Sequence, residues 1–323
     1  MSWFIFALIA TLGWGFADLF YKKGAEDNDR YSHLQTAIWV GLVMGAVAIV
    51  LCFIPSEEKT ITLSNFFIKI FQYSPASLGY IISMVIGYAG MRYLELSIIS
   101  PVQNASGAFS AFIMIVWFVI RGKDLSEEYS ALDIIGNILI VVGIVALAIV
   151  EQKLASAEAD LKPEEKKYKM GALALAFPLL YCLFDTLGTA ADGILLDDEA
   201  TSIGIGEIDV LILYGLTFFV AGVIAWIFLL IKTKKAYNPF AKSEKNNGIA
   251  ACCEEFGQVF YVYAMARNPV LAAPMIASYC IVSVILSRFI LKEKLKASQY
   301  ACVISVIIGI VLLGISEGLS EAE

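Results

Sequence analysis

The sequence contains little charge and almost no histidine. Of its 323 residues, 16% are Asp, Glu, Lys or Arg, whereas 59% are hydrophobic. Such a composition is far from that of a soluble globular domain. The one histidine, His33, stands at the edge of an expected loop, and the sequence contains no HExxH motif. Histidine-based metal sites and serine-type catalysis therefore have no support in this chain.

The cysteines and the net charge also exclude other classes of protein. The six cysteines all lie within apolar segments, and their spacing matches neither a zinc site nor a disulfide framework. The net charge of −7 argues against a nucleic-acid-binding face. The first apolar segment lacks a basic region before it, so a cleavable signal peptide is not expected. No motif indicates a cofactor or a bound metal.

The chain instead contains a series of long apolar runs. Its mean hydropathy is +0.76, and a bilayer core of about 30 Å requires about 20 apolar residues per helix. The runs predict an all-α, multi-pass integral membrane protein of the cell membrane with ten transmembrane helices. We expect these helices at residues 3–21, 34–54, 76–96, 101–121, 131–150, 171–190, 209–231, 248–266, 270–290 and 298–315.

A shorter segment between the second and third expected helices has a different pattern. Apolar residues from Leu63 to Phe71 recur at helical spacing, and polar residues occupy the opposite face. This pattern predicts an amphipathic helix that lies in the membrane interface and is too short to span it. The fourth expected helix opens with Pro101, at a position where proline is tolerated.

The segment at 6–18 has a counterpart 167 positions later, at 173–185. Asp18 then falls on Asp185, and Trp14 falls on Tyr181. Both copies are apolar, both open a series of five expected helices, and both are interrupted, the first by glycines and the second by Pro178. Paired, broken apolar segments in corresponding positions indicate the binding region of a transporter.

A second duplication follows within each half. Pro101 and Pro274 each precede a helix rich in small residues, then a short charged turn and a final glycine-containing helix. Five helices per half is an odd number, so the second half enters the membrane inverted relative to the first. The predicted organisation is a first five-helix repeat at 1–150, a charged linker at 151–169, a second repeat at 170–316 and an acidic tail at 317–323.

These features resemble the drug/metabolite transporter superfamily, and in particular its ten-helix EamA-type branch. The resemblance rests on Trp14-Gly15 in the first helix, on the small-residue helices after Pro101 and Pro274, and on the Lys-Asp-Leu and Glu-Lys-Leu turns. It implies a ten-helix exporter or exchanger of small metabolites. The chain departs from the family pattern by carrying an acid at three positions where apolar residues are common, namely Asp18, Glu254 and Glu255.

Two indications of membrane orientation disagree. The loops after odd-numbered helices carry most of the lysines and arginines. The positive-inside rule therefore places these loops and the 151–169 linker in the cytoplasm, and both termini outside. The family resemblance implies that both termini are inside. We follow the charge distribution of this chain.

Several polar residues fall inside the expected helices. At 1.5 Å per residue, Asp18, Arg92 and Glu254 lie at one depth near the odd-numbered loops, whereas Asp185 lies in the opposite half. Snorkelling of Asp18 or Arg92 to the interface, and a purely structural ion pair of Arg92 with a glutamate, are alternatives that the sequence leaves open.

Helical spacing also defines two polar stripes. Tyr88, Arg92 and Glu95 form one, and Glu254, Gln258 and Tyr261 form the other, with Glu255 about 100° around the helix from Glu254. Trp14 and Tyr181 are either packing residues or stacking platforms. The candidate substrate-binding or coupling residues are Asp18, Glu254, Glu255, Arg92, Gln258, Tyr261, Trp14, Tyr88, Tyr181 and Asp185.

The interpretation that fits these features is a secondary active transporter of a small polar metabolite. We expect a central cavity lined by the first, third, fourth, sixth, eighth and ninth helices, with the fifth and tenth at the periphery. Buried acids favour a cationic or zwitterionic substrate that competes with a proton at Glu254, near Asp18, because the charged form of an acid is costly in an apolar medium. The alternatives are a membrane receptor or scaffold, a passive channel, and an intramembrane enzyme that uses Glu254 and Glu255.

Overall fold

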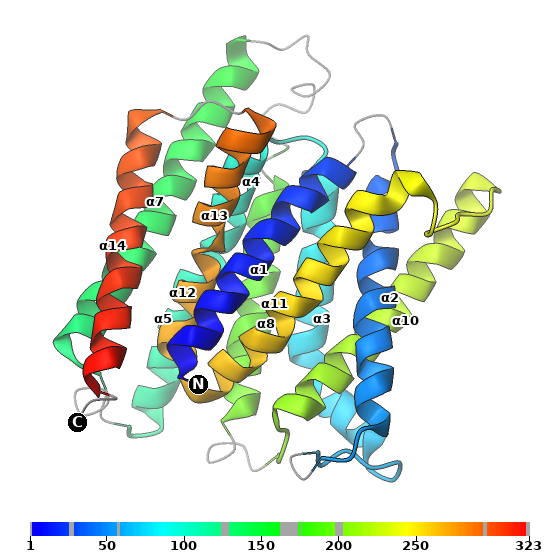
Figure 1. The fold of residues 1–323 in the computed structure, drawn as a ribbon, viewed down its shortest axis with the longest axis horizontal. Helices are drawn as coiled ribbons and strands as arrows, with labels where there is room; N and C mark the ends of the chain where they lie inside the picture. The colour runs from blue at the N-terminus through cyan, green and yellow to red at the C-terminus, as the bar shows by residue number, and fades with distance from the viewer. Residues whose placement is uncertain are drawn as a thin grey trace.

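A computed structural model describes residues 2–320 apart from 26–28, 57–58, 124–128, 162–173, 175, 198–202 and 293–295. Throughout this part of the chain the regular elements are helices, and the long ones form one bundle (Figure 1). The first half contains α1 (Trp3–Gly24), α2 (Ser32–Phe53), α3 (Phe66–Gly90), α4 (Leu96–Asn104), α5 (Ser106–Ile120) and α7 (Ala131–Leu161). The second half contains α8 (Ala176–Leu196), α10 (Glu207–Thr233), η3 (Lys242–Glu244), α11 (Lys245–Arg267), α12 (Pro269–Ala277), α13 (Tyr279–Leu286), η4 (Ser287–Leu291) and α14 (Ala297–Ser320).

The length and composition of these helices confirm the prediction of a multi-pass membrane protein. Within the described residues, nine spans are long and apolar enough to cross a bilayer, with Leu96–Ile120 and Pro269–Leu291 each counting as one. The remaining long helix is α11, with 23 residues. Its polar residues lower its hydropathy, and the bundle buries them, Glu254, Glu255 and Gln258 among them. Because α11 packs along α1 inside the bundle, we count it as a tenth crossing among the described residues.

The prediction of a separate interfacial helix around Leu63 to Phe71 is wrong. The chain turns at 63–65, and Phe66 begins α3, which continues through Pro75 to Gly90. Pro75 has no N–H to donate to the carbonyl of Phe71 four residues earlier. The hydroxyl of Ser74 donates to that carbonyl at 2.8 Å, so the acceptor is satisfied and the helix continues.

Three other expected helix boundaries are also wrong. α3 ends at Gly90 and not near residue 96, so Arg92 and Glu95 do not extend a polar stripe from Tyr88 along one helix. The next helix begins at Leu96, which places Pro101 inside α4 and not at a helix start. α7 continues to Leu161, eleven residues into the expected linker, while 162–173 lie outside the described residues.

Two of the membrane spans are broken into two helices each, α4 with α5 and α12 with α13, and the breaks fall at corresponding positions of the two halves. α4 and α12 are both nine residues long, and both are followed by a single residue that separates them from the next helix. That residue is Ala105 in the first half and Ser278 in the second, 173 positions later, the same offset that relates Pro101 to Pro274. The second duplication in the sequence therefore has a direct structural counterpart.

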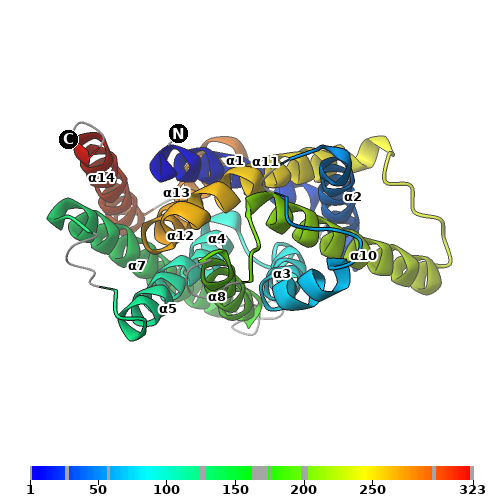
Figure 2. The ribbon, with the colours of Figure 1, turned by 90° about the horizontal axis from the view of Figure 1, so that it is seen from below.

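The packing of the helices is also reciprocal between the halves. α1 packs along α11 and α3 packs along α8, which are equivalent pairs if the halves exchange. α2 packs against α10 at one edge of the bundle, and α7 packs against α14 at the other (Figures 1 and 2). Glycine permits both central crossings, because a Cβ on Gly13 would lie 3.1 Å from Cα of Gly257, and a Cβ on Gly79 would lie 2.8 Å from Cα of Gly188.

Candidate functional site

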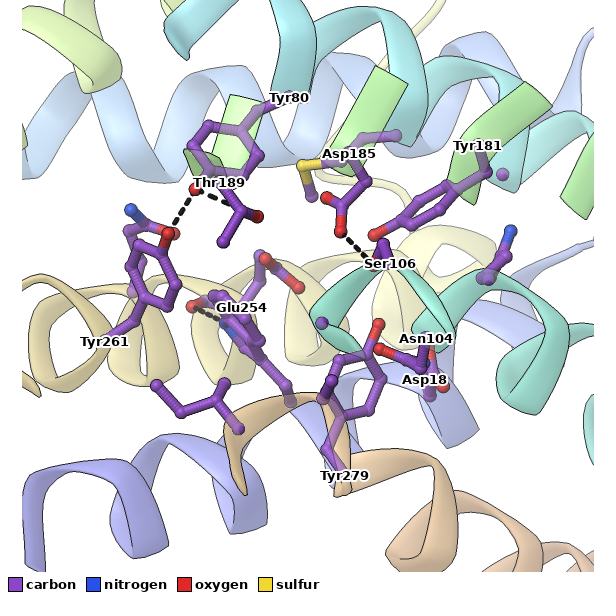
Figure 3. Close-up of a pocket in the computed structure, with 18 of the residues that line it drawn as sticks. Asp18, Tyr80, Asn104, Ser106, Tyr181, Asp185, Thr189, Glu254, Tyr261 and Tyr279 are labelled. Carbon is purple, nitrogen blue, oxygen red and sulfur yellow. Dashed lines mark hydrogen bonds between the residues drawn. The ribbon is translucent and has the colours of Figure 1, made fainter. Parts of the chain in front are cut away.

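A buried pocket lies between the central helices, next to the two helix breaks (Figure 3). Its walls come from α1, α3, α8 and α11, from the two broken helices, and from Tyr214 of α10. These are the helices expected from the sequence with the addition of α10, and α7 and α14 remain peripheral, as predicted. The space left between the side chains is about 50 Å³, which is enough for a few water molecules. The side chains therefore leave room for little more than water in this conformation.

Three carboxylates line the pocket, and serine and tyrosine hydroxyls hold them. Asp18 accepts hydrogen bonds from Ser100 at 2.5 Å and from Ser283 at 2.8 Å. Asp185 accepts one from Ser106 at 2.6 Å. Asp18 and Asp185 are therefore equivalent in structure as well as in the sequence duplication, because each accepts a hydrogen bond from a serine of the broken helices.

Glu254 is less well supplied with donors than the two aspartates. Its Oε2 accepts a hydrogen bond from the hydroxyl of Tyr21 at 3.3 Å, and Tyr88 in turn donates to Tyr21 at 3.3 Å. A buried ionised carboxylate needs several donors or a cation to offset the loss of water. Glu254 is therefore the pocket acid whose charge the described residues compensate least.

Aromatic rings form much of the remaining wall. Trp14 stacks on Tyr261 with ring centroids 5.0 Å apart, and it meets Tyr279 edge-on at 5.7 Å. The indole of Trp14 also donates to the backbone carbonyl of Glu254 at 3.1 Å, which fixes the ring beside that residue. In total one tryptophan and seven tyrosines line the pocket: Trp14, Tyr21, Tyr80, Tyr88, Tyr181, Tyr214, Tyr261 and Tyr279.

Hydroxyl groups close one side of the pocket. The hydroxyls of Tyr80 and Tyr261 are hydrogen-bonded to each other, and Tyr80 donates to Thr189 at 3.3 Å, which joins α3, α11 and α8 (Figure 3). Beyond this group, Asp192 is fully buried and accepts a hydrogen bond of 2.8 Å from Tyr73. The contacts therefore bridge helices of both halves.

Eight of the ten predicted site residues line the pocket. They are Trp14, Asp18, Tyr88, Tyr181, Asp185, Glu254, Gln258 and Tyr261. The amide nitrogen of Gln258 and that of Gln103, which also lines the pocket, are buried and have no acceptor among the described residues. Two unpartnered donors in a polar pocket are typical of groups that a ligand completes.

Arg92 is not among the residues that line the pocket. It lies beyond the end of α3, where its guanidinium donates to the carbonyl of Arg30 at 2.9 Å and lies over the ring of Tyr93 at 5.4 Å. The structure therefore does not bring Arg92 to the pocket with Asp18 and Glu254. The cause is the early end of α3 at Gly90, which carries Arg92 into the following turn.

Glu255 is also absent from the pocket wall, although it is 8% exposed and buried within the bundle. The 100° step between adjacent helical residues aims it away from Glu254. The two glutamates therefore do not form one catalytic pair at the pocket. Among the described residues, no group of three or more His, Cys, Asp and Glu is arranged to hold a metal ion.

Several pocket residues were not identified from the sequence. Tyr21, Tyr80 and Tyr279 belong to apolar helices in which tyrosine is equally common as a packing residue, so the sequence does not distinguish them. Asn104 and Ser106 flank the helix break at Ala105. A signal for these two was present, because they adjoin the run of small residues that follows Pro101.

Comparisons with known proteins support the same fold. Residues 200–315 match the model of the EamA-like transporter family. A solved structure described only as a crystal structure of a protein has a TM-score of 0.59 with this chain at 13% identity, and the similarity covers 97% of this chain and 96% of the other. No curated protein matches the chain. The resemblance drawn from the sequence is confirmed for residues 200–315, which carry the EamA-like pattern, and the long apolar helices show that this chain is a multi-pass integral membrane protein.

Proposed function

We propose that this protein is a secondary active transporter that exchanges a small cationic or zwitterionic metabolite for a proton by alternating access. The observation that carries the proposal is the charge of the central pocket. Asp18, Asp185 and Glu254 line it, and no lysine, arginine or histidine lines it among the described residues. Three acids without a basic partner favour a positively charged ligand.

The aromatic wall supports a substrate with an ammonium group. The face of an aromatic ring attracts a cation, and the attraction is stronger where water is excluded. Trp14 contacts both Tyr261 and Tyr279, and its indole is hydrogen-bonded to the backbone of Glu254. An ammonium group placed against these rings would lie near the acid whose charge is least compensated.

The unpartnered amides extend the proposal from cations to zwitterions. The amide groups of Gln103 and Gln258 offer N–H donors that a carboxylate or hydroxyl of the substrate would accept. A substrate with an ammonium group at one end and an oxygen acceptor at the other would satisfy the acids and the amides together. A simple cation would leave the amides unsatisfied.

Exchange with a proton follows from the position of Glu254. A bound substrate cation or a bound proton would neutralise this carboxylate, and the two would compete for it. Alternating access requires that the pocket open to each side in turn, and the reciprocal packing of the two halves supplies two equivalent ways to open it. The small volume of about 50 Å³ left between the side chains is consistent with a conformation between these two open states.

The test is counterflow into proteoliposomes with a panel of labelled amines, amino acids, organic acids and neutral sugars. We expect counterflow of members with an ammonium group and none of organic acids without one. Glu254→Gln should abolish the dependence of transport on a pH gradient, while the protein stays folded and monodisperse. Glu255→Gln is the matched control, since that residue is buried on the same helix but does not line the pocket. Unchanged pH dependence in Glu254→Gln would refute proton exchange at this residue.

A further inference from the structure

We propose that the segment between α10 and α11 and the adjoining groove form a binding site for an anionic phospholipid. The groove is a separate cavity of about 990 Å³ that runs along the outer face of α11, beside α2 and the segment at 234–244. Figure 2 shows this segment at the edge of the bundle, beside the ends of α2 and α10. The inference does not depend on the transported substrate.

The groove is apolar along its length and basic at one end. Lys245, Gly248, Ile249, Cys252 and Phe256 follow one stripe of α11, from the lysine at the start of the helix toward its middle. Eleven residues of helix correspond to about 16 Å, which is the length scale of a lipid acyl chain within one leaflet. The apolar stripe therefore suits an acyl chain, and the basic end suits a headgroup.

Aromatic rings form the opposite wall of the groove. Trp39 of α2 and Phe240 of the connecting segment meet edge-on with centroids 5.6 Å apart. Phe240 is 78% exposed and Phe256 is 52% exposed, although both are large apolar residues. Gly248 leaves room for the indole, because a Cβ there would lie 3.2 Å from the ring of Trp39. The exposed faces of these rings would pack against the acyl chain of a lipid.

The charge of the segment selects the headgroup. Five lysines lie between residues 232 and 245, and the one acid in this stretch is Glu244. Glu244 is buried and accepts hydrogen bonds from Tyr237 at 2.7 Å and Asn247 at 2.9 Å, so it is not available to the lysines. Burial and the neighbouring Glu244 carboxylate raise the pKa of Tyr237, which keeps its hydroxyl a donor to that acid. Within the described residues, Lys242 and Lys245 are exposed and neither is paired with a carboxylate.

A phosphate diester with a net negative charge is the headgroup that matches two unpaired ammonium groups above an apolar groove. Each lysine near a membrane surface attracts an anionic lipid by about 1 kcal/mol, which corresponds to about fivefold in affinity. A zwitterionic headgroup lacks this net attraction. The site should therefore bind phosphatidylglycerol more tightly than phosphatidylcholine when the two lipids carry the same acyl chains.

Fluorescence of Trp39 provides a direct measurement, because this residue lines the groove. The full-length protein is reconstituted into vesicles of phosphatidylcholine and phosphatidylglycerol of one fixed composition, in which first one lipid and then the other carries brominated chains that quench tryptophan. Subtracting the signal of a Trp39→Phe variant isolates the contribution of Trp39. We expect brominated phosphatidylglycerol to quench Trp39 with an association constant at least about fivefold above that of brominated phosphatidylcholine.

Three double variants complete the test. Lys242→Gln with Lys245→Gln should bring the ratio of association constants close to one, whereas Lys242→Arg with Lys245→Arg should preserve it and exclude misfolding as the cause. Lys292→Gln with Lys296→Gln is the control, since these lysines are exposed but lie outside the groove. Equal quenching by both lipids in the unmodified protein, or a preference that survives Lys242→Gln with Lys245→Gln, would overturn the proposal.

Discussion

Ser283 donates a hydrogen bond of 2.8 Å to Oδ2 of Asp18, although 265 residues separate them in the chain. The bond joins α13, the second segment of a broken helix in one half, to α1 of the other half. Ser283 is also one of the two residues whose hydroxyls donate to Asp18 at the pocket, and the other is Ser100.

Ser283→Ala should therefore destabilise the purified protein. Loss of the hydroxyl leaves a buried carboxylate with one donor fewer, a change that costs about 1–3 kcal/mol. The measurement is the midpoint of thermal unfolding in detergent. Ser287→Ala is the control, because among the described residues that hydroxyl bonds only to the carbonyl of Val284 in its own turn, at 2.9 Å. Equal losses in the two variants would show that the bond to Asp18 adds nothing.

Gly79→Ala should separate α3 from α8. A methyl group at Gly79 would lie 2.8 Å from Cα of Gly188 and 3.1 Å from the carbonyl oxygen of Phe184, and neither backbone atom can rotate away. Overpacking of this kind costs about 1–3 kcal/mol. We expect a lower unfolding midpoint, with a larger loss for Gly79→Leu.

Gly318→Ala is the corresponding control for that series. A methyl group at this position of α14 would meet no atom of the other described elements within 4 Å. Because alanine favours helix over glycine, this variant should be neutral or slightly more stable. A similar loss of stability in Gly79→Ala and Gly318→Ala would contradict the close crossing of α3 and α8.

Tyr261→Phe should make the pocket easier to open. The change removes the hydroxyl that bonds to Tyr80 between α11 and α3, at a net cost of about 1 kcal/mol, or about fivefold in a conformational equilibrium. A cysteine in place of Ala277, which lines the pocket, reports the opening by its rate of thiol labelling in a background without the native cysteines. We expect labelling to be up to about fivefold faster in the Phe variant.

Tyr214→Phe serves as the comparison for this measurement. The hydroxyl of Tyr214 meets only the sulfur of Met84 among the described residues, at 3.2 Å, and a thioether is a weak acceptor. Its removal should leave the labelling rate nearly unchanged. If both variants label at the rate of the parent, the bond between Tyr80 and Tyr261 does not hold the pocket closed.

The distribution of basic residues predicts the membrane orientation. Lys235→Cys lies in an odd-numbered loop, after the seventh crossing, and Ser64→Cys lies in an even-numbered one, and both positions are exposed. Under the positive-inside rule, a membrane-impermeant maleimide should label Ser64→Cys in intact cells and spare Lys235→Cys until the membrane is opened. The reverse pattern would place both termini in the cytoplasm.

The sequence by itself determined the class of protein and the plan of its fold. Apolar runs of about 20 residues can satisfy their backbone in lipid only as helices, so nine crossings among the described residues follow from composition and length. The pairs Asp18 with Asp185 and Pro101 with Pro274 reveal the duplication because these residues recur at corresponding positions of the two halves. The polar stripe of Glu254, Gln258 and Tyr261 predicted the inner face of α11 correctly, because one uninterrupted helix preserves its spacing.

Only the tertiary structure decided where helices end and which polar residues meet. α3 passes through Pro75 because Ser74 satisfies the carbonyl of Phe71, and it stops at Gly90, which removes Arg92 from the pocket. The tyrosines of the wall gain their role from partners more than 60 residues away, such as Tyr88 for Tyr21 and Tyr261 for Tyr80. The periodicity of a sequence reports the face of one helix at a time, whereas a site between nine helical segments depends on how those faces pack.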